Sequence, residues 1–102
     1  MTIAYEFDTR PEHGGVYDVA DGIRWLRMPL PMVLEHINLW LLDDDHGCAI
    51  VDTGVYIDSN REIWRQTLSA PSQDTAVTRV IVTHLHPDHA GCAGWLAREH
   101  DV

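Results

Sequence analysis

The sequence VTRVIVTHLHPDHAG, residues 77–91, is the most informative stretch of the chain. Its first part, residues 77–83, is rich in β-branched side chains and predicts a strand. Residues 84–89 then place three histidines and one aspartate in the pattern His-x-His-x-Asp-His, or HxHxDH. From the composition, roughly 0.004 matches to this pattern are expected by chance in such a chain. We therefore interpret the cluster as a functional motif rather than as a chance match.

The spacing within this cluster suits metal ions. In an extended chain His84 and His86 point to the same side, so that two imidazoles can bind one cation. Pro87 disfavours helical geometry at His86 and starts a turn. Asp88 and His89 then lie at the start of a helix, where they can bind a second cation. Imidazole nitrogens and a carboxylate oxygen suit zinc, with iron and manganese as alternatives.

A plainer interpretation is a polar turn whose side chains only cap a helix. Asp88 would be a good N-cap residue in any protein, but the two histidines before it favour metal binding. Cys92 lies three residues after His89 and could approach the same metal. A small packed residue is the favoured interpretation of Cys92, and Cys48 is expected in the core of a strand. The four tryptophans are also expected in the core.

The remaining sequence predicts a single unit over residues 1–102. An irregular lead-in over 1–21 is followed over 22–102 by strands, a helix, a strand, the metal motif and a second helix. Asp52 is expected in the turn after a strand, where Gly54 would supply a positive φ. Ser59 and Glu62 form a capping-box pattern at the start of the first helix. The expected strands are 16–20, 22–28, 33–42, 48–51 and 77–83, and the expected helices are 59–69 and 89–100.

Composition excludes several classes of function. There are 16 acidic residues against 7 basic ones, all arginine, and the net charge of −9 disfavours nucleic-acid partners. No apolar run approaches the roughly 18 residues that a membrane span needs. The N-terminus lacks the apolar segment of a secretory signal, so we expect a cytoplasmic protein. In that compartment Cys48 and Cys92 are expected as thiols rather than as a disulfide.

The pattern His84-x-His86-x-Asp88-His89, with Asp52-Thr53-Gly54 upstream, resembles the metallo-β-lactamase superfamily and especially its glyoxalase II-like and lactonase-like branches. The resemblance implies an α/β (α+β) fold. This chain would form the N-terminal half of an αββα sandwich, with a mostly antiparallel, mixed sheet and two helices. The resemblance covers roughly residues 22–100, and its specific signal lies in residues 52–54 and 83–91.

The resemblance also implies roles for individual residues. His84 and His86 would bind a first metal ion, and Asp88 and His89 would bind a second. Asp52 would lie near the metal centre and help to orient the metal ligands without binding the metal itself. Asp88 is in addition the expected catalytic residue. The complete site would hold two zinc ions, and a zinc-bound hydroxide would hydrolyse an ester, thioester, lactone or related bond of a small-molecule substrate.

The superfamily's pattern continues with ligands that cannot be assigned here. These are a third histidine for the first metal, a bridging aspartate and a final histidine for the second. We therefore expect an N-terminal half with weak or absent activity, which self-associates through the exposed half-sandwich. The alternatives are a truncated, non-catalytic metal-binding protein, an iron-dependent oxygenase of the same fold, or a phosphodiesterase.

Overall fold

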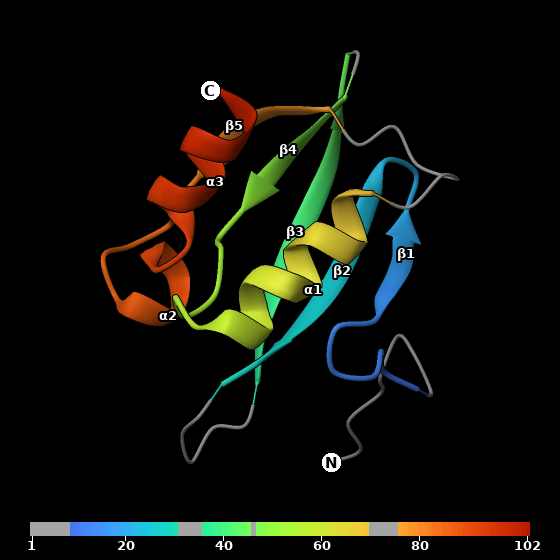
Figure 1. Ribbon diagram of the computed structural model, residues 1–102. Helices are drawn as coiled ribbons and strands as arrows, with labels where there is room; N and C mark the ends of the chain where they lie inside the picture. Colours follow the sequence, from blue (N-terminus) through green and yellow to red (C-terminus); the bar gives the residue numbers. More distant parts are fainter. Residues whose placement is uncertain (1–8, 31–35, 46, 70–75) are drawn as a thin grey trace.

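The computed structural model describes residues 9–30, 36–45, 47–69 and 76–102 (Figure 1). These residues form five strands and three helices. The first four elements are strands, and helices occur only in the second half of the chain. The elements are β1 (Val16–Ala20), β2 (Ile23–Pro29), β3 (His36–Asp44), β4 (Gly47–Val51), α1 (Asp58–Leu68), β5 (Val77–Ile81), α2 (Pro87–Ala90) and α3 (Ala93–His100).

The five strands form one sheet in the order β1-β2-β3-β4-β5. The first four strands are antiparallel neighbours, as consecutive strands joined by short turns usually are. β5 is parallel to β4, and α1 makes the crossover that a parallel pair requires. The mixed, mostly antiparallel sheet confirms the predicted fold class.

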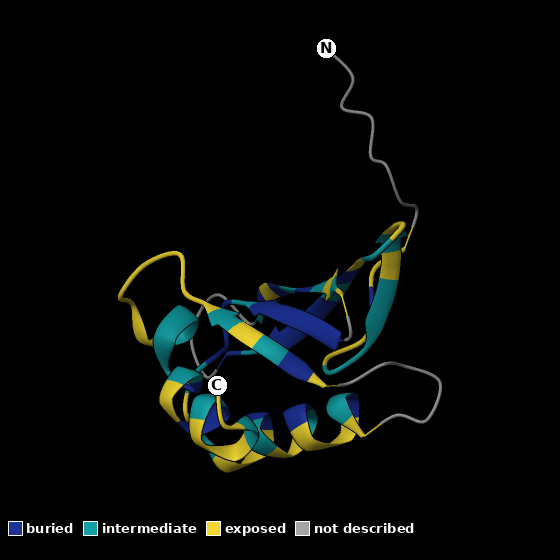
Figure 2. Cartoon of the chain, turned by 90° about the horizontal axis from the view of Figure 1, so that it is seen from above, coloured by how far each residue is buried: buried dark blue, intermediate teal, exposed yellow. Residues whose placement is uncertain are grey.

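Helices α1 and α3 lie on one face of the sheet, as the view in Figure 2 shows. The core fills the space between them and the strands. On the sheet side, alternate residues of the central strands point inward, so that Leu26 pairs with Leu39 and Leu41 pairs with Ile50. Each such side chain contributes about 1.5–3 kcal/mol by leaving water. Helices α1 and α3 contribute the buried side chains of Trp64, Trp95 and Leu96, and Cys92 adds its side chain from the junction before α3.

The opposite face of the sheet carries aromatic side chains. Tyr17, Trp25 and Trp40 occupy paired positions on β1, β2 and β3. The Tyr17 and Trp25 ring centroids are 6.0 Å apart, and those of Trp25 and Trp40 are 6.4 Å apart. The prediction that all four tryptophans lie in the core is therefore wrong for Trp25 and Trp40, which are half-buried on this face. It is confirmed for Trp64 and Trp95.

The start of α1 differs from the prediction. The capping box expected at Ser59 and Glu62 is absent, because the helix begins at Asp58 and Ile57 occupies the N-cap position without a side-chain cap bond. The buried Asn60 amide instead donates to two backbone carbonyls outside the helix, at 3.1 and 3.3 Å. Tertiary contacts thus fix this helix start, and the helix ends at Leu68, one residue before the predicted end at residue 69.

The helix predicted over 89–100 is divided into α2 and α3. The Cys92 backbone N–H points out of α2 and donates to the Thr53 hydroxyl and the Gly54 carbonyl, at 3.0 and 3.1 Å. Continuous helical hydrogen bonding therefore stops at Gly91 and Cys92, and α3 restarts the helix at Ala93.

Two predicted strands have bounds that differ by two or more residues from the observed ones, while β2 and β4 differ by one residue. β5 ends at Ile81 rather than at residue 83, because the Thr83 N–H donates to the Asp52 carboxylate and not to a neighbouring strand. β3 extends to Asp44, and residues 33–35 of the predicted strand lie outside the described part of the chain. Within the described residues, no helix has the length and hydropathy of a membrane span.

Candidate metal centre

The predicted metal ligands follow the carboxyl end of β5. Because β4 and β5 are parallel, with Val51 opposite Ile81, the segments that follow these strands begin at the same edge of the sheet. The Asp52 N–H donates to the Ile81 carbonyl at 2.8 Å and ties the two segments together. Side chains separated by some thirty residues in sequence therefore meet at one point.

Three of the four predicted ligands form a cluster. His84, Asp88 and His89 each offer one ligand atom, and these atoms lie within 4.8 Å of one another. The ring centroids of His84 and His89 are 3.8 Å apart, and His89 Nε2 lies 3.5 Å from Asp88 Oδ2. His86 lies beside the cluster, with its ring centroid 4.9 Å from that of His84.

The donor set fits a first-row divalent cation. Two imidazole nitrogens and a carboxylate oxygen converge, which is the chemistry that zinc, iron and manganese accept. The group is also accessible, since His84 is exposed while Asp88 and His89 are half-buried. Asp88 occupies the second position of α2 rather than its N-cap, and no side-chain cap bond forms there. A purely capping role for Asp88 is therefore wrong.

Asp52 lies directly behind this cluster. Its carboxylate is buried, and Oδ2 is 2.8 Å from His89 Nδ1. Burial alone would raise the pKa of Asp52, but hydrogen bonds from the Thr83 backbone N–H, from His89 and from the Thr83 hydroxyl together lower the pKa below its ordinary value. The group is thus an anion that accepts hydrogen bonds at neutral pH.

The backbone at Asp52 is in the left-handed region, with φ of 62°. Residues other than glycine adopt this conformation uncommonly, and aspartate tolerates it better than most. Gly54 has φ of 84°, as the predicted turn requires. The turn is what brings the Asp52 carboxylate under His89 and Thr83, so one residue serves both in the turn and beneath the cluster.

Sequence reasoning missed the contribution of Thr53. Its hydroxyl donates to the His89 carbonyl at 2.7 Å and accepts from the Cys92 N–H at 3.0 Å, while its own N–H donates to the same His89 carbonyl at 2.8 Å. Thr53 thus fastens the backbone of α2 to the turn. Its place between Asp52 and Gly54 was the available signal, but a hydroxyl in a turn is too common to identify this role from sequence.

Cys92 does not belong to the cluster. Its side chain is fully buried, and the thiol donates to the Val55 carbonyl at 3.4 Å. Burial raises the pKa of the Cys92 thiol to about 11. The thiol is therefore protonated at neutral pH, which confirms a packing role. Cys48 is also buried, and neither cysteine is joined in a disulfide.

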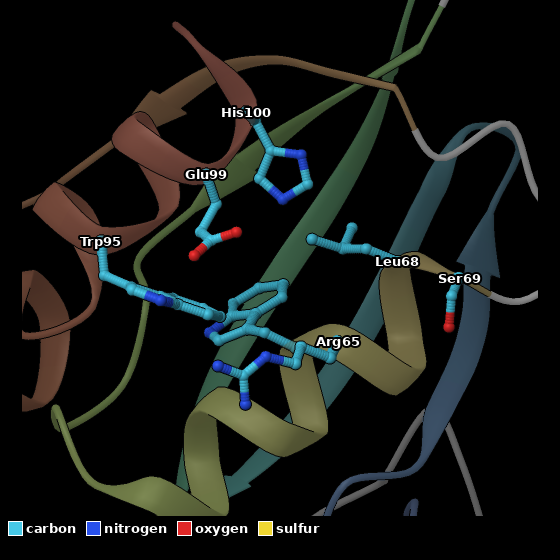
Figure 3. Close-up of a pocket in the computed structure, with 7 residues that line it drawn as sticks. Arg65, Leu68, Ser69, Trp95, Glu99 and His100 are labelled. Carbon is cyan, nitrogen blue, oxygen red and sulfur yellow. The ribbon is translucent and has the colours of Figure 1, made fainter.

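A separate cavity of about 220 Å³ lies between α1 and α3 (Figure 3). Trp95 forms one wall, and Arg65 lies over its indole ring, with the guanidinium carbon 5.3 Å from the ring centroid. None of the predicted metal ligands lines this cavity, so it is distinct from the metal cluster. The lining residues are Trp64, Arg65, Leu68, Ser69, Trp95, Glu99 and His100.

Comparisons with known proteins agree with this arrangement. The family profile of the metallo-beta-lactamase superfamily matches residues 33–102. A beta-lactamase domain protein from Burkholderia ambifaria is 48% identical, with a TM-score of 0.81 over 92% of this chain. A metallo-beta-lactamase family protein from Thermus thermophilus is 30% identical, with a TM-score of 0.69 over 79% of this chain. The matched region spans only 29% and 27% of those two proteins.

Proposed function

Because the chain belongs to the metallo-beta-lactamase superfamily, we propose that it forms the N-terminal part of a zinc-dependent hydrolase. The observation that carries the proposal is the convergence of His84, Asp88 and His89 above the buried Asp52 carboxylate. In the proposed site His84 and His86 hold one zinc ion, and Asp88 and His89 hold a second.

When bound, zinc supplies Lewis-acid chemistry for cleaving an ester, thioester, lactone or related bond of a small molecule. The residues of this chain bind the zinc ions and orient the side chains that hold them. Asp52 holds the His89 ring through Nδ1, and Thr53 holds the His89 backbone. Asp88 is half-buried beside the imidazoles, where its carboxylate can also accept a proton from a reacting water. This is the catalytic role that we propose for Asp88.

The proposal predicts zinc binding by the 102-residue chain through these side chains. Replacing His84→Ala or His89→Ala removes an imidazole from the cluster, and we expect zinc affinity to fall at least about tenfold. His100→Ala is the matched control, because His100 lies in the separate cavity. Isothermal titration calorimetry of chelator-treated protein measures the affinities. Equal zinc affinity in all four proteins would refute the proposed site.

Hydrolysis is tested separately. Since the chain spans less than a third of the two solved relatives, we expect weak or absent turnover of simple esters, thioesters and lactones by the 102-residue chain loaded with zinc. The proposal predicts clear turnover by a protein that carries this chain within the length of its relatives, and loss of that turnover in the Asp88→Asn variant. Turnover that persists in the variant would contradict the role of Asp88.

A further inference from the structure

We propose that Thr83 relays the influence of the Asp52 carboxylate to His84, so that one buried carboxylate fixes the tautomers of two metal-binding histidines. Asp52 would act on His89 directly and on His84 through the Thr83 hydroxyl. Thr83 is in this view a positioning residue. The inference rests on the proposed function, since the tautomer matters because it decides which nitrogen can bind zinc.

The first step is the contact between Thr83 and Asp52. The Thr83 hydroxyl oxygen lies 3.0 Å from Asp52 Oδ1 and 2.8 Å from Oδ2. The Thr83 backbone N–H adds a third contact, to Oδ1 at 2.8 Å. A carboxylate only accepts hydrogen bonds, and a hydroxyl has a single hydrogen to donate. The hydroxyl hydrogen of Thr83 is therefore committed to Asp52.

The second step is the contact between Thr83 and His84. The same hydroxyl oxygen lies 3.1 Å from His84 Nδ1. Because its hydrogen already points to Asp52, the oxygen can only accept at this contact. His84 Nδ1 must then carry the hydrogen, and in a neutral imidazole the lone pair is left on Nε2.

The same logic applies to His89 without an intermediary. Asp52 Oδ2 accepts from His89 Nδ1 at 2.8 Å, which again leaves the lone pair on Nε2. In both rings Nε2 therefore carries the lone pair that can bind zinc, although only the His89 ring contacts the carboxylate. Holding the ring nitrogen that faces away from a metal is a recognised way to fix the tautomer and orientation of a histidine ligand.

The test compares Thr83→Val with Thr83→Ser. Both variants keep the backbone N–H to Asp52, but only serine keeps the hydroxyl. The readout is the imidazole nitrogen spectrum of the metal-free protein, recorded under conditions in which the spectrum shows both rings in the neutral form. We expect Nδ1–H on His84 in the wild type and in Thr83→Ser. We expect a shift towards Nε2–H on His84 alone in Thr83→Val, with His89 unchanged.

Zinc affinity is the second readout. We expect it to fall about 10–100-fold in Thr83→Val and to be retained in Thr83→Ser. An Nε2–H tautomer on His84 in the wild type would overturn the relay, and this outcome can be read even if Thr83→Val does not fold. An unchanged tautomer and affinity in folded Thr83→Val would also overturn it. Failure of the wild type to bind zinc would instead refute the proposed function, because the tautomers are measured without metal.

Discussion

At the scale of single residues, Asp52 combines a strained backbone with several hydrogen bonds to its buried carboxylate. It is buried, has a positive φ, and accepts hydrogen bonds from Thr83 and His89. Backbone strain of this kind costs on the order of 1–3 kcal/mol and persists where surrounding contacts hold it in place. Here those contacts are the hydrogen bonds to the carboxylate, so the side chain offsets the cost of its own backbone conformation.

This balance predicts how the stability of an Asp52→Asn variant depends on pH. At neutral pH we expect the variant to lose about 1–3 kcal/mol of unfolding free energy, because an amide cannot accept all of the bonds that the carboxylate accepts. The pKa of Asp52 is lower in the fold than its ordinary value of 3.8. Its stabilising contribution is therefore present above that value and is lost as the pH falls through the folded pKa.

Urea unfolding of the wild type and of Asp52→Asn, at neutral pH and well below pH 3.8, measures the effect. The difference between the two proteins should be largest at neutral pH and shrink in acid. A difference that is the same at both pH values would show that the charge on Asp52 is not what stabilises the fold.

At the scale of elements, the junction between α2 and the turn after β4 depends on Gly91. A Cβ added there would lie 2.5 Å from the Pro87 carbonyl oxygen, 2.6 Å from the Gly54 carbonyl oxygen and 2.8 Å from the Tyr56 backbone nitrogen. All three neighbours are backbone atoms, which cannot move aside as a flexible side chain would. Gly91 thus allows the metal motif and the turn to lie in contact.

We therefore expect Gly91→Ala to lower the unfolding free energy by about 1–3 kcal/mol, and to weaken zinc binding by displacing α2 from the turn. Gly94→Ala is the matched control, because the added Cβ would meet only the end of the Arg98 side chain, at 3.2 Å. In the first turn of α3 this second change should be neutral or stabilising by up to about 1 kcal/mol. Denaturant unfolding compares the two, and equal stability would contradict the tight junction.

The elements themselves show what sequence patterns can predict. Short-range signals predicted the strand that begins at residue 77, although its end two residues too late, and the convergence of histidines after it, because β-branched side chains and residue spacing act locally. Long-range hydrogen bonds determine the helix boundaries that the sequence patterns did not predict. The break at Cys92 depends on Thr53, and the start of α1 depends on Asn60 reaching carbonyls outside its helix. No local pattern reports such contacts.

At the scale of the whole molecule, the sheet face opposite the helices remains open within the described residues. Paired positions on adjacent strands carry an apolar row across all five strands, made up of Tyr17, Trp25, Trp40, Val51 and Ile81. Ile81 is 41% exposed and lies on β5, at the edge of the sheet. Apolar side chains that gather on an open face and at an exposed edge favour association.

We expect the 102-residue chain to self-associate through this face, and Ile81→Arg to shift the population towards monomer. Val102→Arg is a matched control, since Val102 is similarly exposed, at 50%, but follows α3 rather than belonging to the sheet. Sedimentation analysis over a range of concentrations distinguishes the states. A wild-type chain that stays monomeric throughout would rule out this use of the open face.

The central claim is that the HxHxDH residues form a metal site. Anomalous diffraction at the zinc absorption edge, from crystals of the chain grown with zinc, tests it most directly. We predict anomalous density at the cluster, with one zinc ion about 2.0–2.2 Å from the ligand atoms of His84 and His86 and a second at that distance from the ligand atoms of Asp88 and His89. A zinc ion bound elsewhere in the chain, with these four side chains free of metal, would contradict the proposed site.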